Sequence, residues 1–171
     1  LLLALFIFGI GKAALMPFHF WLPAAMVAPT PVSALLHAVA VVKAGVFGII
    51  KVIIYIFGIE TLQITDASSW LPVVSGFTII VASIVALNSN NLKRRLAYST
   101  VSQLSYVILA ISMLNPFAII ASVFHLVAHA FGKITLFFAA GAIYTSLHKT
   151  EISELNGVGR QMPLTMIAFS L

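Results

Sequence analysis

Cysteine is absent from the sequence, and acidic residues are scarce. Because none of the 171 residues is a cysteine, iron–sulfur clusters, thiolate zinc sites and disulfides built from this chain are excluded. We therefore expect no cofactor on the chain, and any redox group would belong to partner proteins. Only 8% of the residues are charged, 61% are hydrophobic, and the mean hydropathy is +1.13. This composition predicts an integral membrane protein surrounded by the lipid bilayer.

The few charges are mostly basic, and their positions indicate topology. The net charge is +5, but the one basic run, Lys93 to Arg95, is short and lies between apolar stretches, so we expect no nucleic-acid partner. Lys149 and Arg160 lie in a second basic loop, and alternate crossings put both loops on the same side. The positive-inside rule makes that side the cytoplasm or its organellar equivalent. We expect the inner or cell membrane of a prokaryote.

The apolar stretches predict an all-α fold, a polytopic transmembrane helical bundle. Thr30 with Pro31, and Asn115 with Pro116, match the cap-plus-proline start of a helix. Pro17 removes a backbone donor and predicts a discontinuous first span. We expect about five full spans and the start of a sixth, at 1–15 with a short piece at 18–27, 31–58, 71–87, 96–114, 117–147 and from 163, with polar loops at 60–69 and 148–162. Because the sequence begins inside an apolar run without Met, we expect an internal fragment.

The span at 117–147 carries His125, His129 and Lys133 at intervals of four residues. Each step turns a helix by about 40° and rises about 6 Å, so the three side chains share one narrow stripe across the membrane. A lysine at the bilayer centre costs at least about 2.5 kcal/mol and normally faces a protein interior or a water-filled path. A proton path is therefore the leading hypothesis for this stripe.

Three further polar residues lie in the earlier spans. Lys43 falls about 18 Å along the second span, near the centre of a hydrocarbon core about 30 Å thick. Lys12 lies beside the expected helix break, where it either snorkels to the interface or takes part in proton transfer. His37 and His125 could instead be hydrogen-bonded packing residues, and His129 with Lys133 a locked polar network.

Two cofactor interpretations of the histidines are weak. A b-type haem between His37 and either His125 or His129 would be crowded by a lysine in each helix. The HLVAH pattern at 125–129 has the spacing of two zinc ligands, but no glutamate follows the first histidine and no third ligand is near. We therefore predict no metal site.

Three segments of the chain resemble a known family. They are GKAALMPFHFWLPAAMVAPTPVSALLHAVAVVKAG at 11–45, LKRRLAYSTVSQLSY at 92–106 and FHLVAHAFGKITLFFAAGAIY at 124–144. They resemble the proton-conducting antiporter-like subunits, a family that includes the large membrane subunits of respiratory complex I, the A and D subunits of multisubunit sodium/proton antiporters, and subunits of membrane-bound hydrogenases. VVKAG, HAFGKITLFF and HKTEISELNGVGRQMP look closest to the D-type antiporter subunit.

The resemblance implies roles for single residues and for the whole chain. Lys12 and Lys43 look like the lysines of the family's seventh and eighth helices, His129 and Lys133 like the connecting pair of its eleventh, and His37 and His125 like auxiliary residues. The resemblance also implies inverted repeats of five helices within one membrane domain at 1–171, the first repeat ending over 1–58 and the second starting over 71–171.

The function so implied is proton translocation, with sodium/proton antiport as one form, in a subunit that works with other membrane subunits of a complex. The chain itself carries no catalytic chemistry, although a redox-driven pump such as NADH:quinone oxidoreductase or hydrogenase could contain it. The alternatives are a complex I type subunit driven by redox partners, a non-conducting membrane scaffold, and a solute transporter. A scaffold would require permanent carboxylate partners for the buried lysines, yet all four acidic residues lie in expected loops.

Overall fold

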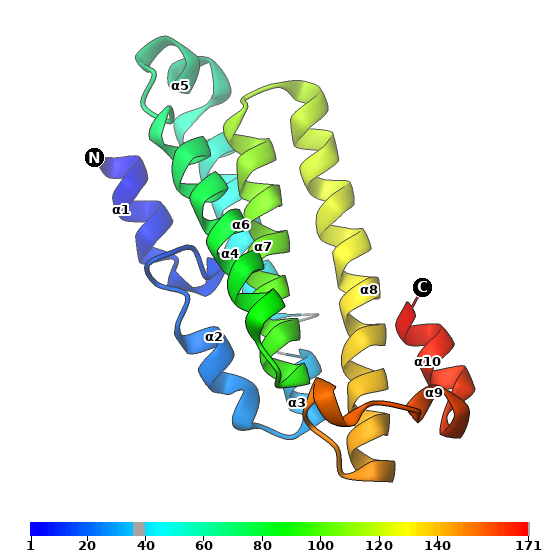
Figure 1. The fold of residues 1–171 in the computed structure, drawn as a ribbon. Helices are drawn as coiled ribbons and strands as arrows, with labels where there is room; N and C mark the ends of the chain where they lie inside the picture. Colours follow the sequence, from blue (N-terminus) through cyan, green and yellow to red (C-terminus); the bar gives the residue numbers. More distant parts are fainter. Residues whose placement is uncertain (36–39, 171) are drawn as a thin grey trace.

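The computed structural model describes residues 1–35 and 40–170, and within them it contains helices and loops but no β-strand. The helices are α1 Leu2–Gly9, η1 Gly11–Ala13, α2 Trp21–Ala24, η2 Ala25–Val27, α3 Thr30–Ala34, α4 Val41–Lys51, η4 Val52–Phe57, α5 Ile59–Thr65, α6 Trp70–Asn88, α7 Leu92–Ser112, α8 Pro116–Leu147, η5 Ile152–Glu154, α9 Val158–Gln161 and α10 Pro163–Ser170. The long helices α6, α7 and α8 run side by side, with α1 and α4 beside them (Figure 1). The predicted all-α polytopic bundle is confirmed.

The last three long spans form close to where they were predicted. Asn115 caps α8 by accepting a hydrogen bond from the amide of Phe117 at 2.9 Å, and Pro116 occupies the first turn, as expected. The fourth span was expected from residue 96, but α7 begins at Leu92. The reason is a cap that the prediction missed, since the side chain of Asn91 accepts a hydrogen bond from the amide of Arg94 at 3.1 Å.

The first span is broken, as predicted, but the break starts before Pro17. Helix α1 ends at Gly9, the tight turn η1 follows, and Ala14 adopts a left-handed conformation with φ of 55°. The indole Nε1 of Trp21 donates a hydrogen bond to the carbonyl of Gly11 at 3.0 Å. The same carbonyl also accepts the amide of Ala14 at 3.2 Å, so the indole adds a second donor at the break and ties the two parts of the broken segment together.

The second span differs from the single helix expected over 31–58. The described residues form α3, α4 and the π-helical η4, and a bend of 78° after Phe57 leads into α5. Gly58 makes this bend possible, because its φ of +78° lies in a region that residues with a Cβ rarely adopt. The polar segment 60–69 was expected to be a loop. The structure corrects this, because Ile59–Thr65 is helical.

The expected capping role of Thr30 is wrong. Thr30 is itself the first residue of α3, and no side chain caps that helix. The Thr30 side chain packs against α8 instead, where a Cβ added to Gly141 would lie only 2.7 Å from its Cγ2 atom. Because Gly141 has no Cβ, α3 and α8 can approach each other closely at this point.

By length and composition, α6 and α8 can each cross a membrane, and the bent pair of Val41–Phe57 with α5 is a third candidate. Helix α7 is also long enough, because 21 residues rise about 31 Å. Part of its polar face contacts a neighbour, since the hydroxyl of Ser102 lies 2.8 Å from that of Ser83 on α6. Hydrogen bonds of this kind help a helix of low hydropathy to pack inside a bundle.

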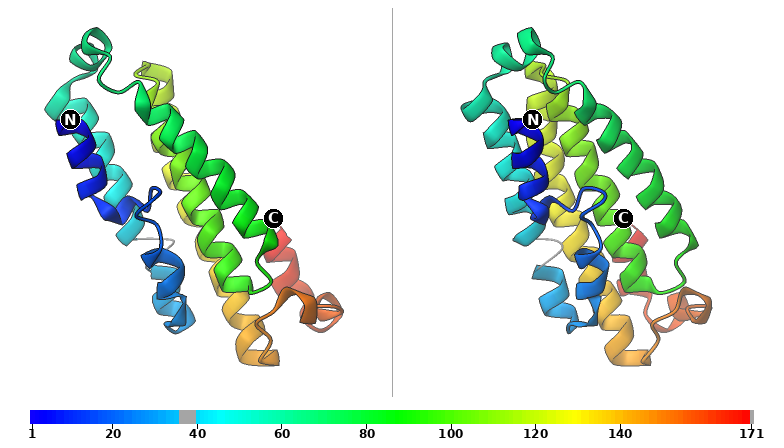
Figure 2. Two further views of the ribbon diagram at one scale, coloured as in Figure 1. Left: turned by 60° about the vertical axis from the view of Figure 1, so that its left-hand side comes forward. Right: turned by 90° about the vertical axis from the view of Figure 1, so that its left-hand side faces the viewer.

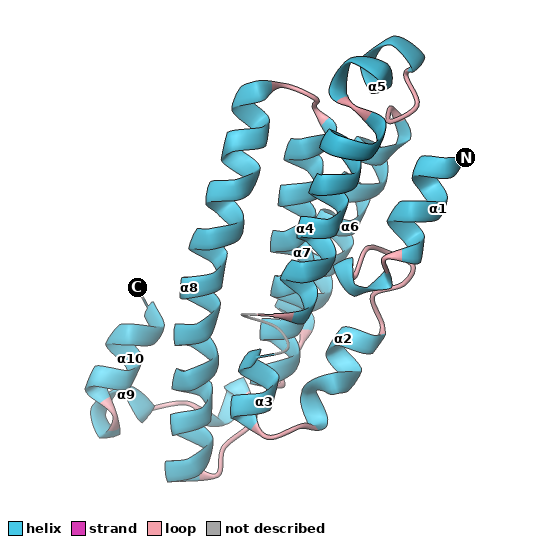
Figure 3. Cartoon of the chain, turned by 180° about the vertical axis from the view of Figure 1, so that it is seen from behind, coloured by secondary structure: helices cyan, strands magenta, loops and turns pink. Residues whose placement is uncertain are grey.

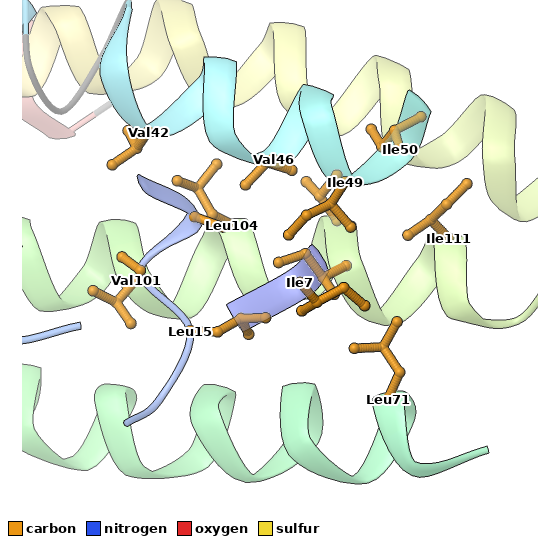
Figure 4. Close-up of a cluster of buried hydrophobic side chains, with 14 of the residues drawn as sticks. Ile7, Leu15, Val42, Val46, Ile49, Ile50, Leu71, Val101, Leu104 and Ile111 are labelled. Carbon is orange, nitrogen blue, oxygen red and sulfur yellow. The ribbon is translucent and has the colours of Figure 1, made fainter. Parts of the chain in front are cut away.

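The core forms where the broken first span, α4, α6 and α7 meet. Figure 4 shows Ile7, Leu15, Val46, Leu71 and Leu104 pointing toward one another from these segments. In Figure 2, α1 and α4 form one layer and α6, α7 and α8 the other. The buried aliphatic side chains between the layers fix the position of α4 relative to α7.

The two basic loops lie at the same end of the molecule, as predicted. The amide of Leu92 donates to the carbonyl of Thr150 at 2.9 Å, and the amide of Ile152 donates to that of Asn90 at 2.8 Å. The Asn90 side chain also donates to Glu151 at 2.8 Å. Helix α5 lies at the opposite end (Figure 1), and α10 folds back along α8 (Figure 3). Which end faces the cytoplasm stays a prediction.

Candidate functional site

The predicted stripe on α8 faces the inside of the bundle. Lys133 is only 3% exposed and His129 only 8%, and His125, one turn earlier, is partly buried. Large apolar side chains of α8 on other faces, among them Phe124, are exposed. The sequence folds this way because an apolar helix in lipid turns its ionisable side chains toward its protein neighbours.

Lys133 is held by a main-chain acceptor on the neighbouring helix α7. Its Nζ atom donates a hydrogen bond to the carbonyl oxygen of Leu96 at 3.1 Å, and the bond is buried. The carbonyl is neutral, so this contact orients the ammonium group without cancelling its charge. A neutral acceptor leaves the lysine able to give up its proton, whereas a carboxylate would hold it in an ion pair.

Lys43 approaches the same region from α4. It is 8% exposed, and it lies close enough to Lys133 and His129 for its charge to act on both. Three ionisable groups from two helices therefore share one buried region. Like charges repel strongly where water is scarce, so protonating all three groups at once has a high electrostatic cost.

The two histidines extend this region along α8. The rings of His125 and His129 are 6.3 Å apart between centroids and nearly parallel, at 14°, and the Tyr106 ring lies 6.3 Å from that of His125. Among the described residues, neither ring nitrogen of His129 has a hydrogen-bond partner, and neither does Nε2 of His125. Buried polar atoms of this kind are commonly satisfied by ordered water, which is also the usual carrier of protons between side chains.

Lys12 is placed differently from the other predicted residues. Its side chain is exposed, while its backbone packs on α4: a Cβ on Gly45 would lie 2.6 Å from the Lys12 carbonyl carbon. Gly45 is two residues from Lys43, so the break in the first span lies beside the helix that carries Lys43. The predicted role of Lys12 stays a prediction, and His37 lies outside the described residues.

Two buried features were missed by sequence reasoning, one in the site and one outside it. The Leu96 carbonyl could not be recognised, because every residue has such an acceptor and only the packing selects one. His19 is 6% exposed, and its ring lies 4.1 Å from that of Phe20 and 6.1 Å from that of Tyr98. Its position two residues after Pro17, in the broken segment, was the available signal.

In the described part of the chain, no three His, Asp or Glu side chains are placed to hold a metal ion together. All four acidic residues are described and exposed; they are Glu60, Asp66, Glu151 and Glu154. The buried region is thus built from basic groups, hydroxyls and backbone carbonyls. Such a set can pass protons between sites, but it offers no carboxylate for a cation.

The whole chain, residues 1–171, matches the family model described as NADH:quinone oxidoreductase/Mrp antiporter, TM. It is 41% identical over 158 residues to the A/B subunit of a probable K⁺/H⁺ antiporter of Rhizobium meliloti, covering 92% of this chain and 15% of that protein. It is 38% identical over 165 residues to the L subunit of the NADH-quinone oxidoreductase of Rickettsia bellii, covering 95% of this chain and 24% of that protein.

Among solved structures, the Mrp complex from Dietzia sp. DQ12-45-1b contains a similar chain. The TM-score is 0.86 at 35% identity, over 96% of this chain and 18% of that one. The chain thus spans about a quarter or less of the length of these relatives. The two related sequences named are an A/B and an L subunit, so the expected likeness to the D-type subunit stays a prediction.

Proposed function

The chain belongs to the NADH:quinone oxidoreductase/Mrp antiporter transmembrane family, and we propose that it is part of a proton-translocating subunit in a multisubunit membrane complex. The observation that carries the proposal is the burial of Lys43, His129 and Lys133 in one region where α4, α7 and α8 meet. Charges inside a membrane protein are costly, and they mark ion and proton paths.

Protons would move by exchange among these groups. A proton arriving on Lys43 repels one on Lys133, because the two ammonium groups act on each other across the buried region. His129, one turn from Lys133, and then His125 would accept and pass protons through bridging water. Lys12 would extend the path on the side of the first span, and His37 is proposed as an auxiliary residue of the same path. Arginine could not replace these lysines, since it keeps its proton.

The driving force would come from outside the chain. In one form, a counter-flowing cation exchanges for protons. The name of the Rhizobium relative suggests K⁺ as that cation, and Na⁺ is the other candidate. In the other, redox chemistry in partner subunits drives the transfer, as the name of the Rickettsia relative suggests. Further membrane subunits of the same complex are the partners, and the inner membrane of a prokaryote is the location we propose. The end of a first inverted repeat over 1–58 and the start of a second over 71–171 belong to this proposal.

A scaffold role explains the site less well. Buried lysines that only hold helices together would be paired permanently with carboxylates, because an uncompensated buried charge destabilises a protein. The carboxylates of this chain are all exposed, and Lys133 bonds a neutral carbonyl instead. The basic region is therefore better suited to changing its charge than to fixing the fold.

Replacing Lys43 by Met tests the proposal, because Met keeps the length of the side chain and removes the proton site. We expect proton movement in native membrane vesicles to fall to background at normal abundance of the complex. Lys51→Met is the matched control on α4: Lys51 is exposed, with its ammonium over the Phe47 and Tyr55 rings, and its loss should leave transport unchanged. Full transport by Lys43→Met would refute a relay through Lys43.

A further inference from the structure

Lys133 shares its acceptor with a hydroxyl group. The Leu96 carbonyl, which accepts Nζ of Lys133 at 3.1 Å, also accepts the Thr100 hydroxyl at 2.9 Å. In an α-helix it accepts the amide of Thr100 as well. A carbonyl oxygen has two lone pairs and can accept two strong hydrogen bonds. Three donors therefore compete for two acceptor positions on this atom.

The shared acceptor is deeply buried. Thr100 is fully buried, Leu96 is 6% exposed and Lys133 is 3% exposed. Little water is available at such a site to accept a hydrogen bond from a donor that leaves the carbonyl, so the hydroxyl and the ammonium compete directly for it. The hydroxyl is bonded within its own helix, whereas the lysine reaches across from α8, which makes the lysine the donor that can leave.

We propose that Thr100 is a positioning residue for proton transfer, whose hydroxyl keeps the bond between Lys133 and α7 weak enough to break in each cycle. This inference rests on the proposed function, since it matters only if Lys133 exchanges its proton. A Lys133 ammonium with a free lone pair on Leu96 would be held more tightly in its protonated form. Thr100 would thus speed the departure of Lys133 toward His129.

Thr and Ser residues inside helices often make the same bond to the fourth residue before them, so the bond alone is not evidence of function. Thr78 on α6 provides the comparison. It is fully buried and donates to the Val74 carbonyl at 2.8 Å, an acceptor for which no lysine bond is found among the described residues. Thr78→Val therefore measures the effect of losing one such hydroxyl without the competing lysine.

The test compares Thr100→Val, Thr100→Ser and Thr78→Val in the complete subunit within its complex, by the rate and pH dependence of proton movement in vesicles. Valine keeps the shape and removes the hydroxyl. We expect Thr100→Val to slow transport about fivefold, equivalent to about 1 kcal/mol, and to raise the pH of half-maximal transport. Thr100→Ser should restore both. The charges of Lys43 on α4 and His129 on α8 also act on Lys133. All three variants keep both residues, so these charges do not differ between them.

Thr78→Val should leave the rate and the pH profile unchanged. If Thr100→Val behaves like Thr78→Val, or if Thr100→Ser fails to restore the profile, the positioning role is refuted. Lys133→Ala separates this outcome from failure of the proposed function. If that variant transports normally, the relay itself is wrong, whatever Thr100 does.

Discussion

Gly45 on α4 is the point at which the structure predicts the sharpest steric penalty. A Cβ at this position would lie 2.6 Å from both the Ala13 amide nitrogen and the Lys12 carbonyl carbon, where ordinary contacts are 3.4–4 Å. Both neighbours are backbone atoms, so neither can rotate away. In Gly45→Ala, α4 and the broken first span must therefore separate by roughly 1 Å, and overpacking of this kind costs about 1–3 kcal/mol.

Gly48→Ala is the control for this prediction. Gly48 lies on the same helix, where a Cβ would meet only the Ile10 side chain, at 3.8 Å. Alanine gains about 1 kcal/mol of helix propensity over glycine in both variants, so their difference isolates the clash. We expect the purified complex to have a lower Tm with Gly45→Ala than with Gly48→Ala, and proton transport to fall because Lys12 moves. Equal Tm values would refute the close approach of the broken segment to α4.

Two further predictions concern topology and the broken helix. Arg94 and Ala67 are both exposed and lie at opposite ends of the molecule. Cysteines introduced at these two positions should react with a membrane-impermeant reagent from opposite faces of the membrane, the one at Arg94 from the cytoplasmic face. Reaction of both from the same face would contradict the span assignment. Trp21→Phe removes the side-chain donor to the Gly11 carbonyl, leaves the Ala14 amide bonded to it, and should destabilise the protein by about 1 kcal/mol. Trp70→Phe, which loses a similar but exposed bond to Ala67, should cost less, and an equal loss in the two variants would show that the Gly11 bond has no special role.

The sequence predicted the features that depend on single residues or on helical periodicity. Asn115 and Pro116 marked the start of α8, and the spacing of four residues placed His129 and Lys133 on its buried stripe. The apolar stretch at 71–87 became α6 with an error of one residue at each end. These predictions succeeded because a cap, a period or a continuous apolar run acts locally.

The predictions that failed concern features that depend on contacts between segments far apart in the sequence. Thr30 looked like a cap by its type, but it packs on Gly141, more than a hundred residues later. The helix α5 lies in a stretch whose polar residues suggested a loop, and part of its support is the bond from Gln63 to the Leu114 carbonyl. The acceptor of Lys133 is likewise a carbonyl of another helix, which no pattern of side chains could identify.

The most direct test of the relay compares Lys133→Arg with Lys133→Ala in vesicles at equal abundance of the complex. Arginine keeps the positive charge and can still donate to the Leu96 carbonyl, but it does not release its proton at physiological pH. The relay predicts that both variants lose proton transport, although the arginine variant assembles normally. Normal transport by Lys133→Arg would show that Lys133 supplies only a charge, and would contradict the central claim that it carries protons.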